Sequence, residues 1–406
     1  MKILPTLLVS SALLLAEESF SDFQNEFQNS IKQEKEDFQK YKEENEREFQ
    51  QFKAELEAEY KQYKKLLDAE FKQYKKELSQ YWEDPKTSSA HIWVEYSEDK
   101  KRRKIIDFEK GEIRIEIISK KNRDEVEKQL LADTVVIMAE SPETAIKKDV
   151  VTQKVEEKFK KITKQEVAKS KVEKTPFLAD LVAPNTTVRE KIKIAKEMKS
   201  ETKAESSKKV SGAKVYSTVI KLPKNFPVKR ASKFRKDANK YAKEFKIESA
   251  LVFAIMHSES SFNPMAKSHI PAYGLMQVVP RSAGIDAYYM VYKKKRVLPG
   301  SYLFNSTQNI EMGTAYLHIL YYRYLKSITN PESRLYATIA AYNTGAGNVA
   351  KAFTGKTNIR VASRTINKMS PEEVKEKLLK DLPWDETKHY LEKVSKRYEI
   401  YKSAGY

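Results

Sequence analysis

The sequence contains no cysteine, and this absence removes several kinds of chemistry at once. Without cysteine the chain has no disulfide bond, no thiolate nucleophile and no cysteine-ligated metal. Its five histidines are scattered, and no HExxH pattern joins two of them. Neither a GxxxxGK[ST] loop nor a GxGxxG loop after a strand occurs, so no phosphate or dinucleotide site is indicated. We therefore expect no metal and no cofactor.

Long hydrophobic runs are also scarce, and the one at the N-terminus is short. The first residues, MKILPTLLVSSALLLA, carry one lysine before a mostly apolar stretch, and acidic residues follow. This layout is typical of a secretory signal peptide over residues 1–16, with cleavage after Ala16 and export to the periplasm or cell envelope. An uncleaved signal is the alternative. It is also the only route to membrane attachment, because no other run is long enough to cross a bilayer.

The charge balance is strongly basic. The 406 residues include 76 Lys or Arg and 57 Asp or Glu, which gives a formal net charge of +19. Such an excess favours an anionic partner, for example a nucleic acid, a membrane surface or a carboxylate-bearing polymer. No RNA-binding aromatic signature or zinc-finger spacing accompanies the charge, so we expect no nucleic acid as partner.

Residues 17–84 predict one long amphipathic or coiled-coil helix. Aromatic residues recur there every eleven positions, at Phe27, Phe38, Phe49, Tyr60, Phe71 and Trp82. Eleven residues make three turns at about 3.67 residues per turn, so these side chains form one nearly straight stripe. The helix is then a spacer or an arm for self-association. A helix that folds back on its own domain is the alternative, since the stripe needs a partner but does not identify it.

The next region, residues 85–223, predicts a small strand-rich α+β domain. Apolar and polar residues alternate at period two in HIWVEYS, RKIIDFEKGEIRIEIIS, DTVVIMAE and AKVYSTVIKLP, which is the pattern of half-buried strands. Lysine-rich helical patterns occupy residues 144–170, and a polar, low-complexity stretch near 197–212 predicts a linker. From residue 224 to 406 the pattern becomes helical.

Within that helical part, the stretch HSESSFNP places a glutamate at the end of an apolar helix. The helix is predicted to begin near Glu248, and Glu259 follows Val252, Ile255 and Met256 at spacings of seven, four and three residues. Partial desolvation and the negative end of the helix dipole then both favour a protonated carboxyl. A neutral carboxyl at pH 7 can donate a proton. The alternative is an ordinary surface glutamate at a helix end.

Five motifs in a fixed order resemble the lytic transglycosylases of the soluble, lysozyme-like type. Fifteen residues separate Glu259 from the glycine of GLMQ, as in that family. The part before residue 224 looks like the N-terminal region of the membrane-bound type C enzymes. The resemblance implies an α+β chain whose residues 224–406 form an all-α, lysozyme-like domain. The motifs are ESSFNP (259–264) with Ser268, GLMQ (274–277), NIxxGxxYL (309–317), AYN (341–343) and ETKHY (386–390).

This resemblance implies cleavage of the β-1,4 bond between N-acetylmuramic acid and N-acetylglucosamine in peptidoglycan glycan strands, with a 1,6-anhydromuramyl product. Glu259 would be both acid and base, and one carboxyl suffices if the acetamido oxygen of the substrate attacks C1. The binding residues carried over from the family are Ser268, which orients Glu259, Met276 and Gln277 at the acetamido group, Tyr342 and Asn343 at the reacting sugar, and Glu386 and Tyr390 on the far side.

Two other functions remain open from the sequence. A hydrolase of the same fold would let water attack C1, and a non-catalytic envelope scaffold would bind glycan without cutting it. Asp286 and Glu311 are the nearest candidates for a second carboxylate, and we interpret both as structural or solvated residues. The lipidated cysteine that anchors membrane-bound members is absent from this sequence.

Overall fold

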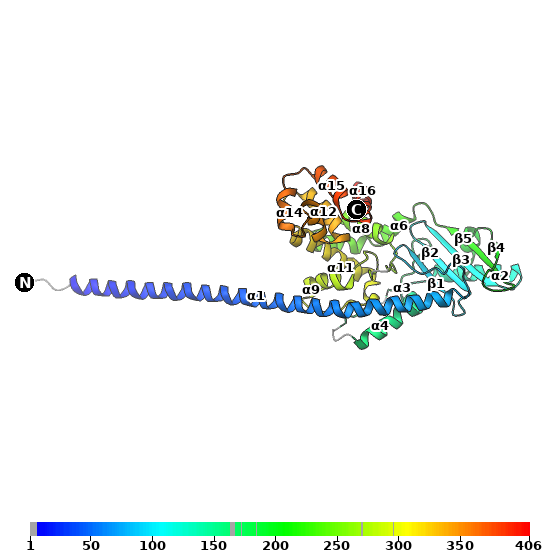
Figure 1. Cartoon of the computed structure of the whole chain (residues 1–406), viewed down its shortest axis with the longest axis horizontal. Helices are drawn as coiled ribbons and strands as arrows, with labels where there is room; N and C mark the ends of the chain where they lie inside the picture. Colours follow the sequence, from blue (N-terminus) through cyan, green and yellow to red (C-terminus); the bar gives the residue numbers. More distant parts are fainter. Residues whose placement is uncertain (1–5, 163–166, 172, 184, 269–270, 295) are drawn as a thin grey trace, which may run out of the picture. The chain divides into compact units, whose positions relative to one another are not determined.

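The computed structural model describes residues 6–162, 167–171, 173–183, 185–268, 271–294 and 296–406 (Figure 1). The chain divides into two compact units, residues 1–58 and 59–406. Helices and one sheet make up the second unit, so the predicted α+β class is confirmed. The borders predicted after residues 16, 84 and 223 stay a prediction. Residues 1–5 of the predicted signal lie outside the described residues.

Helix α1 (Thr6–Leu78) is continuous and covers most of the helix predicted over residues 17–84, but it begins within the predicted signal and ends six residues earlier. Its two ends differ in environment. In the first unit, the Phe38 and Tyr41 side chains are 68% and 65% exposed. In the second unit, the ring of Tyr63 packs edge-on against Phe159 at 5.1 Å between centroids, and its hydroxyl lies 2.6 Å from that of Tyr273. The part of the helix in the second unit therefore folds back on its own unit. Self-association through the exposed aromatic residues stays a prediction.

An antiparallel five-stranded sheet follows α1, in the order β1-β2-β3-β5-β4. Three of the four predicted strand segments form β1, β2, β3 and β5, and Gly111 makes the β2–β3 turn with φ of +64°. The predicted polar linker is partly wrong, because its exposed residues 203–206 pair with β5 as an edge strand. The strands are β1 Ile92–Tyr96, β2 Arg102–Asp107, β3 Glu112–Ser119, β4 Lys203–Ser206 and β5 Lys214–Lys221.

The fourth predicted strand, DTVVIMAE, is instead the end of helix α2 (Arg123–Met138). The Asn122 side chain caps the first turn by accepting from the amide of Glu125. Val126, Leu130 and Ile137 are then buried at helical spacing, on the side that packs against β3. A short apolar run does not reveal its period by itself, and here the cap and the longer pattern upstream decide for the helix.

The remaining helices surround the C-terminal core, which is continuous with the core beneath the sheet. Over the described residues of 224–406 the chain forms helices and isolated bridges, as predicted, and Ser370 and Glu373 form the capping box that begins α15. The bounds are α3 Pro142–Lys148, α4 Val150–Ile162, α5 Val188–Met198, α6 Phe226–Lys233, α7 Arg235–Glu244, α8 Ser249–Ser260, α9 Ile285–Tyr292, α10 Gly300–Leu303, α11 Ser306–Ile319, α12 Pro331–Thr344, α13 Ala346–Thr354, α14 Ile359–Ile366, α15 Pro371–Asp381 and α16 Asp385–Ser403, with π-helical turns at Pro280–Gly284 and Leu320–Tyr324.

Among the helices of the described part, none combines the length and the apolar character that a membrane span requires.

Candidate active site

Helix α8 carries Glu259 into the centre of the second unit. It begins after Glu248, as predicted, but residues 250–256 are buried on every side rather than along one stripe. It ends where Ser261 and Phe262 both adopt left-handed backbone angles, with φ of +50° and +62°. Such angles are unfavourable for residues other than glycine and need support from the surroundings. Part of the support comes from Arg230, a fully buried residue whose guanidinium donates to the carbonyl of Phe262.

The Glu259 carboxyl lies in a largely desolvated position at the end of this helix. Burial raises its pKa from 4.5 to about 7. A hydrogen bond from the Tyr390 hydroxyl to Oε1, 2.7 Å long, and the charge of Lys393 act in the opposite direction, whereas the charge of Glu386 adds to the rise. The side chain is still partly exposed. Glu259 can therefore hold or release a proton near neutral pH and meet a ligand from solvent.

Two tyrosines flank this carboxyl and stay neutral. Burial and the charge of Glu259 raise the pKa of both Tyr342 and Tyr390 well above the usual value. The Tyr342 hydroxyl, on α12, donates to the backbone carbonyl of Met276 at 2.8 Å. The structure thus brings Glu259, Tyr342, Tyr390 and the GLMQ segment together from four separate parts of the sequence.

The GLMQ segment is fixed by the side-chain amide of Asn309 on α11. Asn309 accepts from the Met276 amide at 2.8 Å and donates to the carbonyls of Tyr273 and Leu303 at 2.7 and 2.9 Å. Gly274 has φ of +75°, and a Cβ there would lie 2.2 Å from the Leu303 carbonyl oxygen. Only glycine therefore fits this turn.

Two further contacts join the same segment to α8 and α11. The Ser260 hydroxyl, next to Glu259, donates to the Leu275 carbonyl at 2.7 Å. Gly313 gives the Met276 side chain room, since a Cβ there would lie 2.4 Å from its sulfur. This explains the small residue in NIxxGxxYL.

The other predicted binding residues lie in different environments. Asn343 is exposed, and its Oδ1 accepts from the hydroxyl of Thr387 at 2.7 Å, next to the exposed Glu386.

Gln277 is buried, and its side-chain amide donates back to the Gly274 carbonyl at 3.1 Å. The Met276 side chain is fully buried. The Ser268 amide donates to the carbonyl of Ala272 at 3.1 Å. The substrate roles of all these residues, including the bond from Ser268 to Glu259, stay predictions.

Several residues that position the site could not be recognised from the sequence, namely Ser260, Asn309 and Thr387. Lys393, whose charge lowers the pKa of the Glu259 carboxyl, could have been recognised, because it follows Tyr390 by three and Glu386 by seven residues and so shares their face of α16. The two candidate second carboxylates are engaged elsewhere. Glu311 accepts from the Tyr292 hydroxyl at 2.7 Å, and Asp286 accepts from that of Tyr324 at 2.9 Å. Within the described ranges, no group of His, Asp and Glu is placed to hold a metal.

Comparison with known proteins decides the family. A model of the transglycosylase SLT domain matches residues 237–362. A membrane-bound lytic murein transglycosylase C from Pectobacterium atrosepticum is 35% identical over 314 residues, which are 76% of this chain and 82% of that protein. This chain belongs to the lytic murein transglycosylase family. It is an enzyme of that class, and the word membrane-bound in its relatives' names agrees with the predicted location in the cell envelope.

Other similar proteins carry the same description. The enzyme of Serratia proteamaculans is also 35% identical, over 76% of this chain and 82% of its own length, and that of Sodalis glossinidius is 43% identical over 46% and 52%. Among solved structures, the Slt lytic transglycosylase of Pseudomonas aeruginosa is 25% identical with a TM-score of 0.33, covering 42% of this chain and 24% of that one. The 70 kDa soluble lytic transglycosylase of Escherichia coli is 25% identical with a TM-score of 0.31, covering 41% and 24%.

Proposed function

We propose that this lytic transglycosylase acts on peptidoglycan glycan strands. It would cleave the β-1,4 bond between N-acetylmuramic acid and N-acetylglucosamine and form a 1,6-anhydromuramyl end. The observation that carries this proposal is the Glu259 carboxyl, whose pKa of about 7 makes both of its protonation states accessible at neutral pH. A group that must act first as acid and then as base works best when its pKa lies near the working pH.

In the first step Glu259 acts as the acid. Since Tyr390 donates to Oε1, we assign the transferable proton to Oε2. This proton passes to the glycosidic oxygen as the bond from that oxygen to C1 breaks. The acetamido oxygen of the same sugar attacks C1 and stabilises the positive charge that develops there, so a second carboxylate is unnecessary. The N-acetylglucosamine chain leaves as an alcohol.

In the second step the same residue acts as the base. The Glu259 carboxylate takes the proton of the C6 hydroxyl, O6 attacks C1, and the acetamido oxygen leaves. The anhydro bridge is then closed, Glu259 is protonated again, and no water has been consumed. Two neutral phenols beside the carboxylate, Tyr342 and Tyr390, favour this mechanism because they cannot compete with it as bases at neutral pH.

Digestion of purified sacculi tests the proposal. Wild-type protein should release muropeptides that are lighter by one water than the products of a hydrolase, as measured by mass spectrometry. Glu259→Gln should reduce the release by at least about 1,000-fold, since it removes the only transferable proton. Glu311→Gln is the matched control, because Glu311 also has a raised pKa but is bonded to Tyr292. Products with reducing muramic ends, or an undiminished rate for Glu259→Gln, would contradict the proposal.

A further inference from the structure

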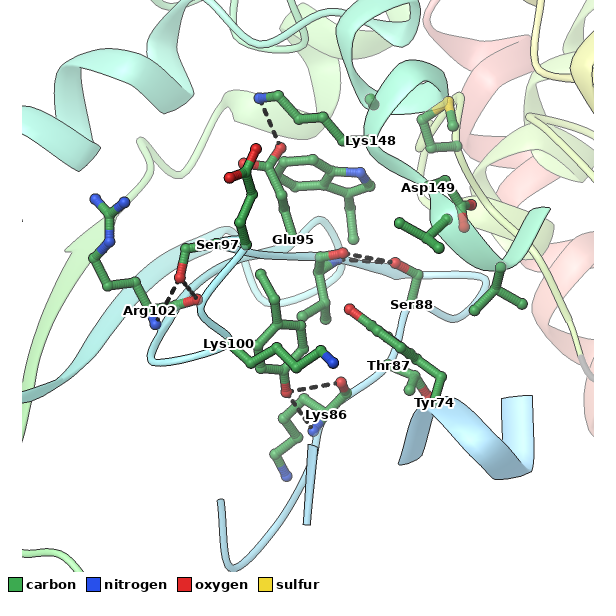
Figure 2. Close-up of a pocket in the computed structure, with 18 of the residues that line it drawn as sticks. Tyr74, Lys86, Thr87, Ser88, Glu95, Ser97, Lys100, Arg102, Lys148 and Asp149 are labelled. Carbon is green, nitrogen blue, oxygen red and sulfur yellow. Dashed lines mark hydrogen bonds and ion pairs between the residues drawn. The ribbon is translucent and has the colours of Figure 1, made fainter. Parts of the chain in front are cut away.

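A cavity of about 690 Å³ lies in the second unit, and none of the residues assigned to the reaction belongs to its lining (Figure 2). It forms where the C-terminal end of α1 meets β1, the start of β2 and the junction of α3 and α4. Its volume falls within the range of about 300–1,000 Å³ that small-molecule sites occupy. The activity proposed above does not use this cavity.

Most of the charged groups that line the cavity already have ionic partners. Glu95 pairs with Lys104 at 2.5 Å and with Lys148 at 3.0 Å. On another side, Asp149 accepts from Lys267 at 2.6 Å. A charged ligand would have to break these pairs in a partly buried place, which is costly. The lining therefore favours a ligand without net charge.

Aromatic rings and hydroxyl groups form the rest of the wall. The ring of Tyr74 lies edge-on to that of Tyr96 at 6.2 Å, and Phe71 and Trp93 also line the cavity. In the described part of the chain, neither the Tyr74 hydroxyl nor that of Thr87 has a hydrogen-bond partner. Figure 2 shows the Tyr74 hydroxyl directed toward the middle of the lining residues. Aromatic faces beside hydroxyl groups suit a molecule with apolar ring faces and many hydroxyls.

We propose that this cavity is a second saccharide site, which binds an uncharged N-acetyl amino-sugar segment of a glycan strand. Tyr74 and Thr87 would hydrogen-bond the hydroxyl and acetamido groups, and the rings would cover the apolar faces of the sugars. This inference rests on the proposed function for its choice of glycan. Its ligand chemistry follows from the paired charges and the aromatic lining.

The cavity also touches the segment that follows the catalytic helix. Met265 and Lys267 belong to its lining, and Lys267 directly precedes Ser268. The Lys267 amide donates to the Ser89 carbonyl at 3.4 Å. A glycan held in the cavity would thus stay attached close to the catalytic segment. Because a second attachment raises the effective concentration of substrate at the first, processing of long strands should benefit more than that of short ones.

Calorimetric titration of the full chain with a neutral trisaccharide of N-acetylglucosamine tests the site. The titrated protein carries Glu259→Gln, which prevents cleavage, and it should bind two equivalents of the trisaccharide. Adding Thr87→Trp, which fills the cavity, should leave one equivalent, while Thr365→Trp on the exposed face of α14 should leave two. Adding Tyr74→Phe should weaken the second site about threefold to tenfold through the loss of one hydrogen bond. Tyr41→Ala, an exposed tyrosine on the same helix, should have no effect.

Three outcomes would overturn the inference. They are one equivalent bound before any cavity substitution, two equivalents bound after Thr87→Trp, and a Thr87-dependent site that takes a stem peptide but no trisaccharide. None of these binding outcomes changes the expectation that the wild-type enzyme forms anhydro products. Failure of this inference is therefore distinguishable from failure of the proposed function, which those products test.

Discussion

Replacing Glu259 by glutamine should stabilise the folded protein at high pH and leave it unchanged at low pH. Burial raises the pKa of this carboxyl from 4.5 to about 7 in the folded state. Below about pH 4.5 the carboxyl is protonated in both the folded and the unfolded chain, so it imposes no penalty. Between about pH 4.5 and 7 only the unfolded chain releases the proton, and the wild-type free energy of unfolding falls as pH rises.

The size of the effect follows from the same pKa difference. Each unit corresponds to about 1.4 kcal/mol, so the shift from 4.5 to about 7 amounts to about 3 kcal/mol. Above pH 7 the whole penalty is present in the wild type and absent from the glutamine variant. Glutamine keeps the shape of the side chain and an oxygen that can accept from Tyr390, so the comparison isolates the ionisation.

Urea unfolding of both proteins, followed by circular dichroism at several values between about pH 4 and 8.5, measures this difference. The stability gap between Glu259→Gln and wild type should be near zero at the acid end and about 3 kcal/mol at the basic end. Glu376→Gln is the control, because Glu376 is exposed and does not contribute to the Glu259 shift, so its substitution should change the free energy of unfolding by less than about 0.5 kcal/mol throughout. A gap that is the same at both ends would refute the argument that burial keeps Glu259 neutral.

Three further predictions concern the groups that support the site. Tyr390→Phe removes a hydrogen bond that lowers the pKa of the Glu259 carboxyl, so if Glu259 is the acid as proposed, the basic limb of the kcat/KM profile should move to higher pH while kcat falls. Gly313→Ala should lower the free energy of unfolding, measured in urea, by about 1–3 kcal/mol, because its Cβ would lie 2.4 Å from the Met276 sulfur. Gly347→Ala is the control and should be tolerated, since the nearest atom to a Cβ there is 3.5 Å away. Asp149→Asn should cost about 3 kcal/mol, since it leaves the partly buried Lys267 ammonium without its anionic partner.

Much of the catalytic region could be predicted from the sequence because its signals are local. The apolar run before Glu259 and the capping box at Ser370 depend on neighbours within a few residues, whereas the glycine of GLMQ is required by Leu303 and Asn309, which lie 29 and 35 residues away. The Asn309 contacts could not be predicted in this way, since its three partners lie six to 36 residues away. In the sequence, Asn309 is an ordinary polar residue near the start of a helix. Only the fold brings the three backbone groups to its side-chain amide.

The errors in the strand-rich region have a related cause. DTVVIMAE contains four consecutive apolar residues, which fit a strand at one period and a helix at another. The segment forms the end of helix α2 rather than a strand, because residues upstream extend the apolar face of the helix and Asn122 caps its first turn. Residues 203–206 looked like a linker because the stretch around them is polar and low in complexity. They form a strand because β5 leaves an open edge whose backbone groups they can pair with.

The strand-rich region also contacts the segment that follows Glu259. The chain that leaves α8 turns sharply at Ser261 and Phe262 and is held from outside the helical region. Because left-handed angles at these residues are unfavourable, the turn depends on these external contacts, and so does the position of the carboxyl just before it. The conformation around Glu259 therefore results from both regions of the second unit. The contacts join Ser261 to His91 at 3.1 Å, Asn263 to the Ala90 carbonyl at 3.2 Å, and Lys267 to the Ser89 carbonyl and Asp149 at 3.4 and 2.6 Å.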